Sequence, residues 1–135
     1  KLKHWYTGEQ ILYKGDTYII EIKRQVKDEI HIRIDKNQKK FEITIPENLL
    51  EEEKKQWIDK SVKQLFKINT EEMLQTKLPY WSKITNIIYK TYKVRDTISK
   101  YGSCIPKTKI LHFNARLIML PEDKIDAIIV KNFII

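Results

Sequence analysis

The sequence predicts an α+β fold: an amino-terminal antiparallel β-meander, a long central helix or helix pair, then carboxy-terminal strands and a final helix. Apolar residues alternate with polar ones over residues 1–46, recur at helical spacing over 47–85, and form a strand-turn-strand-helix pattern over 86–135. With 135 residues, 33% of them charged and 41% hydrophobic, the chain is long enough for one domain with its own core. We therefore expect residues 1–135 to form a single domain.

The meander is predicted by three runs with a period of two, at residues 18–22, 30–34 and 41–45, in which one face is apolar. This pattern is typical of half-buried antiparallel strands. A shorter strand is expected at residues 10–13, and Pro46 ends the pattern. The breaks between the runs are short, polar and of hairpin length, at residues 14–16, 25–28 and 35–38.

The central segment changes to helical spacing after Pro46. Acids at residues 51–53 precede lysines at 54–55, which suits the helix dipole and i,i+4 pairing. A pause at Asn69-Thr70 would give a helix pair, and we expect Pro79 to end or kink the helix. The apolar stripe, which we interpret as core packing, contains Leu50, Trp57, Ile58, Ser61, Val62 and Leu65.

The last third contains a strand region at 86–95, a tight turn at 101–104 and a short strand at 110–113. Pro121-Glu122-Asp123 is a good helix start. The apolar run that follows stops at Ile135 without a cap, so we expect residues 125–135 to mediate self-association. Its inward-facing residues are expected to be Ile125, Ile128, Ile129 and Phe133.

Composition excludes several classes of protein. No apolar run approaches the roughly 18 residues of a transmembrane helix, and no signal peptide opens the chain, so no membrane partner is expected. The single cysteine, Cys104, excludes an intramolecular disulfide and a cysteine-based zinc site. A reducing, cytoplasmic location is the expectation.

Basic charge is concentrated between residues 77 and 116, which carry nine basic residues and one acid, Asp96. The remainder has 17 of each sign. With its aromatics, this segment could bind nucleic acid through phosphate contacts and stacking. The alternative is a solvated face with Tyr80, Trp81, Tyr89, Tyr92 and Tyr101 packed inward. The candidate polyanion-binding residues are Lys83, Lys90, Lys93, Arg95, Lys100, Lys107, Lys109 and Arg116.

A family resemblance appears from Arg95 onward. The segments RDTISKYGSC at 95–104, LHFNARLI at 111–118 and IDAIIV at 125–130 resemble the YgjP-like metallopeptidases, zincins related to the WLM and SprT groups. In that family such segments lead into a zinc-binding His-Glu-x-x-His motif, and Tyr101 stands where Trp is usual. The residues that match the family's structural motif are Arg95, Tyr101, Gly102, Ser103, Cys104, Asn114, Arg116 and Pro121.

The resemblance fails at the zinc motif. Lys131 occupies the first His position, Asn132 that of the catalytic Glu and Ile135 that of the second His. A lysine ammonium has no lone pair for zinc, an amide is no general base, and an isoleucine cannot ligate a metal. We therefore expect no catalytic residue, metal ligand or cofactor in this chain, although the resemblance implies zinc in complete members. The abrupt change after Val130 indicates an incomplete zincin-like fold, truncated in its final helix, for example by a frameshift.

Other catalytic groups are sparse. The histidines His4, His31 and His112 show no metal-ligand spacing, and Cys104 with His112 is the remaining nucleophile–base pair. The resemblance makes the turn around Cys104 structural. The first hypothesis is thus a catalytically incompetent relative of zinc metallopeptidases. The second is a pseudoenzyme that acts as a basic binding module for nucleic acid or an acidic protein; activity without zinc is a third.

Overall fold

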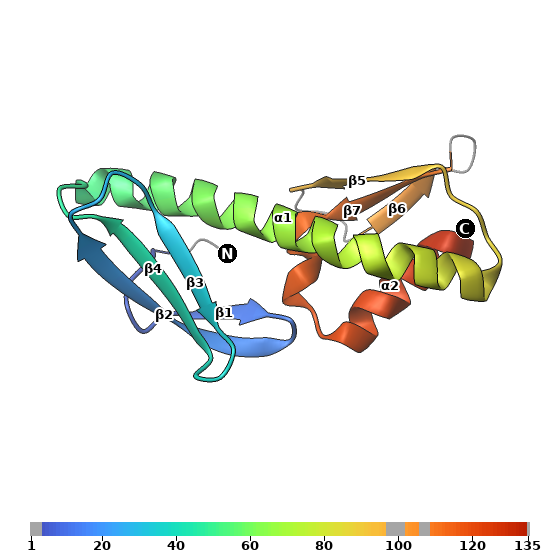
Figure 1. Cartoon of the computed structure of the whole chain (residues 1–135), viewed down its shortest axis with the longest axis horizontal. Helices are drawn as coiled ribbons and strands as arrows, with labels where there is room; N and C mark the ends of the chain where they lie inside the picture. Colours follow the sequence, from blue (N-terminus) through green and yellow to red (C-terminus); the bar gives the residue numbers. More distant parts are fainter. Residues whose placement is uncertain (1–3, 97–101, 106–108, 135) are drawn as a thin grey trace. The chain divides into compact units, whose positions relative to one another are not determined.

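A computed structural model describes residues 4–96, 102–105 and 109–134, of which 102–105 are described by their backbone. It confirms the α+β class (Figure 1). The chain divides into two compact units, unit 1 (residues 1–64) and unit 2 (residues 65–135), and α1 contributes to both. The single-domain expectation stays a prediction. The elements are β1 (Gln10–Tyr13), β2 (Asp16–Gln25), β3 (His31–Asp35), β4 (Lys40–Pro46), α1 (Glu51–Thr85), β5 (Thr91–Arg95), β6 (Gly102–Ile105), β7 (Ile110–Asn114), the 3₁₀ helix η1 (Ala115–Met119) and α2 (Glu122–Ile134).

The sheet of unit 1 corrects the predicted meander. Its order is β1-β2-β4-β3, with two antiparallel hairpins, β1–β2 and β3–β4, and a parallel pairing of β2 with β4. The predicted hairpin at residues 25–28 is therefore wrong. Strand alternation fixes which face is buried but not which strand is the neighbour. The strand with the most buried side chains, β4, takes the central place, while the isoleucines of β3 at the sheet edge are only partly buried.

The core of unit 1 lies on one face of this sheet and includes the first turns of α1. Ile20, Phe41 and Ile43 are completely buried, as is Ile58 of the helix. The segment before β1 is tied to the helix, because the indole Nε1 of Trp5 donates to Asp59 Oδ1 at 2.6 Å. The buried faces predicted from alternation are thus confirmed.

The central helix is one helix rather than a pair. It continues through Asn69-Thr70 and through Pro79, and it ends at Thr85. Thr70 is completely buried, and its hydroxyl donates to the Ala115 carbonyl at 2.7 Å, so a residue that reads as a helix break is held by a distant partner. Of the two expectations for Pro79, that it ends the helix is wrong, and that it kinks the helix stays a prediction.

The apolar stripe of the helix differs in part from the prediction. Ile58 and Val62 are buried as expected, but Leu50 and Trp57 are 56% and 41% exposed. Leu50 precedes the helix, and its carbonyl accepts the Glu53 N–H, as an N-cap residue does. The buried positions recur every fourth residue: Ile58, Val62, Phe66, Thr70, Leu74 and Leu78.

Unit 2 has a three-stranded sheet of order β5-β7-β6, in which β7 pairs parallel with β5 and antiparallel with β6. The strand expected at 86–95 begins only at Thr91. Asn86, just after α1, has a φ of 58°, a left-handed conformation that commonly ends helices. The core cluster contains Leu74, Leu78, Val94, Leu111, Phe113, Ala115, Leu117, Ile125, Ile129 and Phe133.

The final helix begins where the sequence predicts. The Pro121 carbonyl accepts the N–H groups of Lys124 and Ile125, so the helix opens directly after the proline. Of the four residues expected to face inward, Ile125, Ile129 and Phe133 are buried and Ile128 is partly buried against the same core. Within the described ranges, no helix combines the length and apolar character needed to cross a membrane. The cytoplasmic location stays a prediction.

Candidate functional site

Lys131 and Asn132, which the sequence predicts to stand at the family's zinc-motif positions, lie in the last turn of α2. The Lys131 side chain is exposed, whereas Asn132 is buried, with 3% of its surface exposed. Ile135 lies outside the described residues. The helix α2 therefore contains Lys131 and Asn132. Whether these positions could bind zinc depends on the chemistry of their side chains.

These side chains do not fit a zinc ion. Lys131 is a cation, and the buried Asn132 Nδ2 has no hydrogen-bond partner among the residues that the structure describes. An amide N–H₂ is a donor, so this buried group needs an acceptor rather than a metal. In the part of the chain that the structure describes, no three His, Cys, Asp or Glu side chains gather as a metal site would require.

The start of α2 is anchored to α1 by a polar cluster. Asp126 Oδ1 accepts from Lys77 Nζ at 2.9 Å and from the Trp81 indole at 3.0 Å, and Glu122 accepts from Lys77 at 3.1 Å. Burial lowers the pKa of Lys77, but the hydrogen bonds and charges of Asp126 and Glu122 outweigh it and raise this pKa above its ordinary value. Lys77 is therefore engaged in the fold and is not available to a ligand.

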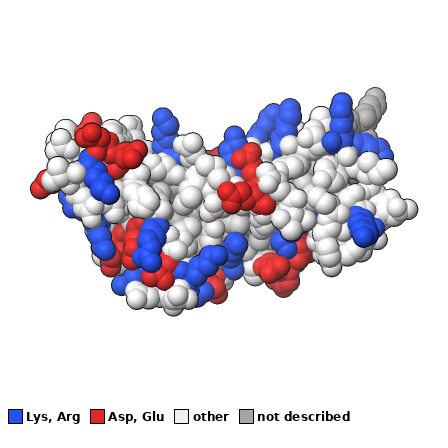
Figure 2. Space-filling view, in the orientation of Figure 1, with Lys and Arg blue, Asp and Glu red and all other residues white. Residues whose placement is uncertain are grey.

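Most of the described candidate polyanion-binding residues lie free at the surface of unit 2. Lys90, Lys93, Arg95 and Lys109, which we call the basic track, are exposed, and none has an ion-pair partner among the described residues. Lys83, in the last turn of α1, is likewise exposed. Figure 2 shows basic side chains gathered over β5. Lys100 and Lys107 lie outside the described residues.

The basic track follows the edge strand β5. The Lys90 N–H donates to the Lys109 carbonyl at 2.9 Å, which places these two lysines side by side where β5 and β7 begin. Lys93 pairs in register with His112, and Arg95 lies two residues further along the strand. At about 3.3 Å per residue, the track from Lys90 to Arg95 is about 16 Å long.

Arg116 differs from the track residues because it has an acidic partner. Its Nε lies 3.4 Å from Asp96, the one acid of the basic segment, and its backbone N–H donates to Asn114 Oδ1 at 2.9 Å. Asn114 is buried and caps η1. Its role could have been read from the sequence, since Asn before a helix is a frequent N-cap.

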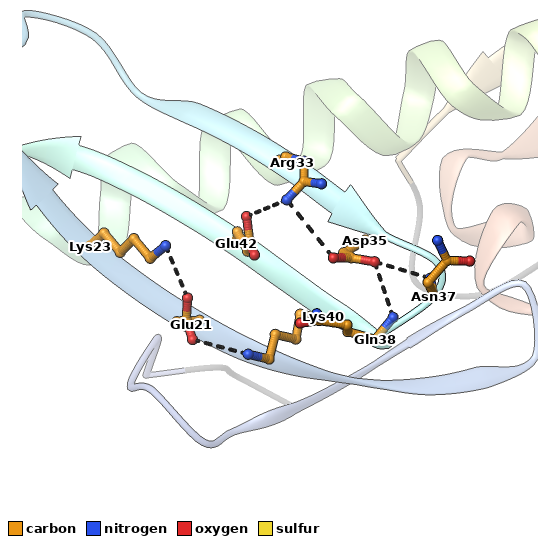
Figure 3. A network of polar contacts seen from close by, with 8 residues as sticks. All are labelled: Glu21, Lys23, Arg33, Asp35, Asn37, Gln38, Lys40 and Glu42. Atoms are coloured by element: carbon orange, nitrogen blue, oxygen red, sulfur yellow. Dashed lines mark hydrogen bonds and ion pairs between the residues drawn. The ribbon is translucent and has the colours of Figure 1, made fainter.

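The exposed side of the unit 1 sheet contrasts with the track because its bases are matched by acids (Figure 3). Arg33 Nη1 lies 2.9 Å from Glu42 Oε1. The Glu21 carboxylate lies 3.3 Å from Lys23 Nζ through Oε1 and 3.6 Å from Lys40 Nζ through Oε2. The hydrogen bond from Lys23, followed by the charge of Lys40, lowers the pKa of Glu21. Charge is therefore balanced locally on this sheet and unbalanced along β5.

The aromatic residues of the basic segment do not accompany the track. Trp81, Tyr89 and Tyr92 are partly buried and pack against the core of unit 2, which agrees with the alternative of inward packing. Tyr80 is 58% exposed and lies on α1. Tyr101 lies outside the described residues.

The predicted tight turn at 101–104 is also corrected. Gly102, Ser103 and Cys104 belong to β6, which is hydrogen-bonded to β7, and Tyr101 is not described. Cys104 pairs in register with Leu111, one position from His112. Backbone pairing with a strand later in the sequence decides this structure, which local turn propensity does not reveal.

The fold and these motif residues define a metallopeptidase-like protein. This chain belongs to the YgjP-like family, because the model of the YgjP-like metallopeptidase domain matches residues 1–131. The match confirms the resemblance read from the sequence. No curated protein and no solved structure matches the chain.

Proposed function

We propose that this chain is a non-catalytic member of the YgjP-like family that binds nucleic acid through the basic track. The observation that carries the proposal is local charge imbalance: the four track residues are exposed and without ion-pair partners among the described residues, whereas bases on the unit 1 sheet lie beside acids. Surface cations that neutralise phosphates release counterions, which is the main source of non-specific affinity for nucleic acid.

The non-catalytic part of the proposal rests on the residues at the family's catalytic positions. Zinc hydrolases need ligands with an available lone pair, such as a neutral His, a carboxylate or a thiolate, and a group that takes a proton from bound water. Lys131 and Asn132 supply neither, and the buried Nδ2 of Asn132 has the polarity of a donor. The basic track does not include Lys131 or Asn132, so the proposed binding does not depend on zinc chemistry.

Charge reversal along β5 tests the proposal. Binding of a labelled oligonucleotide should weaken at least tenfold in the double variant Lys90→Glu, Lys93→Glu, with an unchanged circular dichroism spectrum because both side chains are exposed. The matched control is Lys27→Glu, Lys60→Glu, which changes the net charge equally at exposed positions of unit 1. Equal affinities of the two double variants would contradict a nucleic-acid surface on β5. Binding of polyglutamate but not of oligonucleotide would instead favour an acidic protein partner.

A further inference from the structure

We infer that the basic track binds the phosphate backbone alone, so that the chain takes single-stranded and double-stranded nucleic acid alike, without sequence preference. This inference rests on the proposed function and adds the mode of recognition. It follows from the distribution of charged and aromatic side chains over the two faces of β5.

The two faces of β5 carry different chemistry. Lys93 and Arg95 are exposed, whereas Tyr92 is partly buried and Val94 is buried, so the strand alternates cation and core residue. The Tyr92 hydroxyl donates to the Glu71 carbonyl of α1 at 3.4 Å, which fixes that ring on the core side. The exposed face therefore offers charge without a ring from its own strand.

The neighbouring aromatic residues Tyr89 and Trp81 also make contacts within unit 2. The Tyr89 ring lies 5.8 Å from that of Phe133, and the Trp81 indole donates to Asp126 at 3.0 Å. Single-strand-specific proteins depend on exposed rings, each worth about 1–3 kcal/mol per stacked base. Among the described residues of the track and its flanks, Lys83 to Asp96, no large aromatic ring is exposed, so bases have no stacking platform there.

The spacing of the cations suits a phosphate chain. Lys93 and Arg95 are two residues apart on one strand, about 6.6 Å, and the whole track is about 16 Å long. Successive phosphates of one strand advance about 3.4 Å along a helix axis while winding around it, so about four or five is the upper limit for a straight track of this length. Lysine and arginine contacts to phosphates position a nucleic acid but carry no sequence information.

The test measures fluorescence anisotropy with the full chain and 20-nucleotide probes over a salt series. The probes are oligo-dT, a mixed single strand and its duplex. For four phosphate contacts, the slope of log K against log salt should be about −3.6 on the duplex and about −2.8 on single strands. The three dissociation constants should agree within about threefold at low salt, and Lys93→Ala should reduce each slope by about 0.7–0.9.

Two further variants separate the outcomes. Tyr80→Ala should leave every affinity unchanged, because this exposed ring lies on α1 and not on β5. Lys60→Ala, the control for lost charge in unit 1, should not reduce the slopes. A single-strand preference above about thirtyfold, the size of one to two stacked bases, or its loss in Tyr80→Ala would overturn phosphate-only recognition and leave the proposed function standing. Absence of binding to all three probes would overturn both.

Discussion

Lys77 Nζ lies 2.9 Å from Asp126 Oδ1, and this contact joins α2 to the second half of α1 within unit 2. The same carboxylate oxygen accepts the Trp81 indole, so one acid holds two side chains that lie one helical turn apart on α1. Both partners are mostly shielded from water, with side-chain exposures of 18% and 26%. The contact therefore belongs to the structural framework of the helix that carries Lys131 and Asn132.

Loss of this contact should destabilise the protein. We expect Lys77→Met to lower the free energy of unfolding by about 1–2 kcal/mol, because a hydrogen bond to a charged group is lost while Asp126 stays partly buried. Lys60→Met, at an exposed position, is the control and should change stability little. Urea denaturation of both variants measures the difference, and equal midpoints would contradict a stabilising role.

The same contact should be sensitive to alkaline pH. The pKa of Lys77 is raised in the folded protein, so its contribution is fully present below the unfolded-state value of 10.5 and is lost as pH rises through the folded-state pKa. The stability difference between wild type and Lys77→Met should therefore be constant from neutral pH to about pH 10 and narrow above it. A difference that widens above pH 10.5 would show that the sign is wrong.

Asn132 is a site where a less polar residue should increase stability. Within the described part of the chain its buried Nδ2 has no hydrogen-bond partner, and an unsatisfied buried donor costs about 1–3 kcal/mol. We expect Asn132→Leu to raise the thermal midpoint, and Asn132→Asp to lower it at neutral pH by burying a carboxylate. If Asn132→Leu instead lowers stability by more than about 1 kcal/mol, the amide is hydrogen-bonded in solution.

Zinc should not copurify with the chain. The residues at two of the family's motif positions are a cation and an amide whose buried nitrogen is a donor, so neither can replace a ligand or the catalytic base. Elemental analysis of protein purified without an affinity tag and dialysed in chelator-free buffer measures this. Stoichiometric zinc would contradict the prediction and would direct attention to Cys104 and His112.

Self-association through residues 125–135 stays a prediction, and the structure selects the residue that tests it. Phe133 is buried against Tyr89, so a polar residue there would disrupt unit 2, whereas Ile134 is 71% exposed. Ile134→Ser should shift sedimentation toward monomer, and Ala127→Ser, at another exposed position of α2, should not. A wild type that is monomeric at high concentration would refute association through this helix.

The sequence by itself determined most of the local elements. Alternation placed the buried faces around Ile20, Phe41 and Ile43, because side chains of a strand point to opposite faces in turn. The Pro121 helix start followed from local chemistry. The absence of a zinc motif at Lys131 and Asn132 stays a prediction from the sequence, made there because the ability to bind a metal is a property of the residue type.

The tertiary structure decided which strands pair and which side chains contact one another. The parallel pairing of β2 with β4 could not be read from alternation, since a period of two specifies a face and not a partner. Thr70 lies inside α1, and Ala115, 45 residues away, accepts the hydrogen bond of its hydroxyl. Trp81 and Tyr92 occur in a basic segment whose sequence is equally compatible with a stacking surface. In the structure, hydrogen bonds to Asp126 and to the Glu71 carbonyl hold their side chains on the core side. Long-range partners fix these choices, and a local sequence pattern contains no information about them.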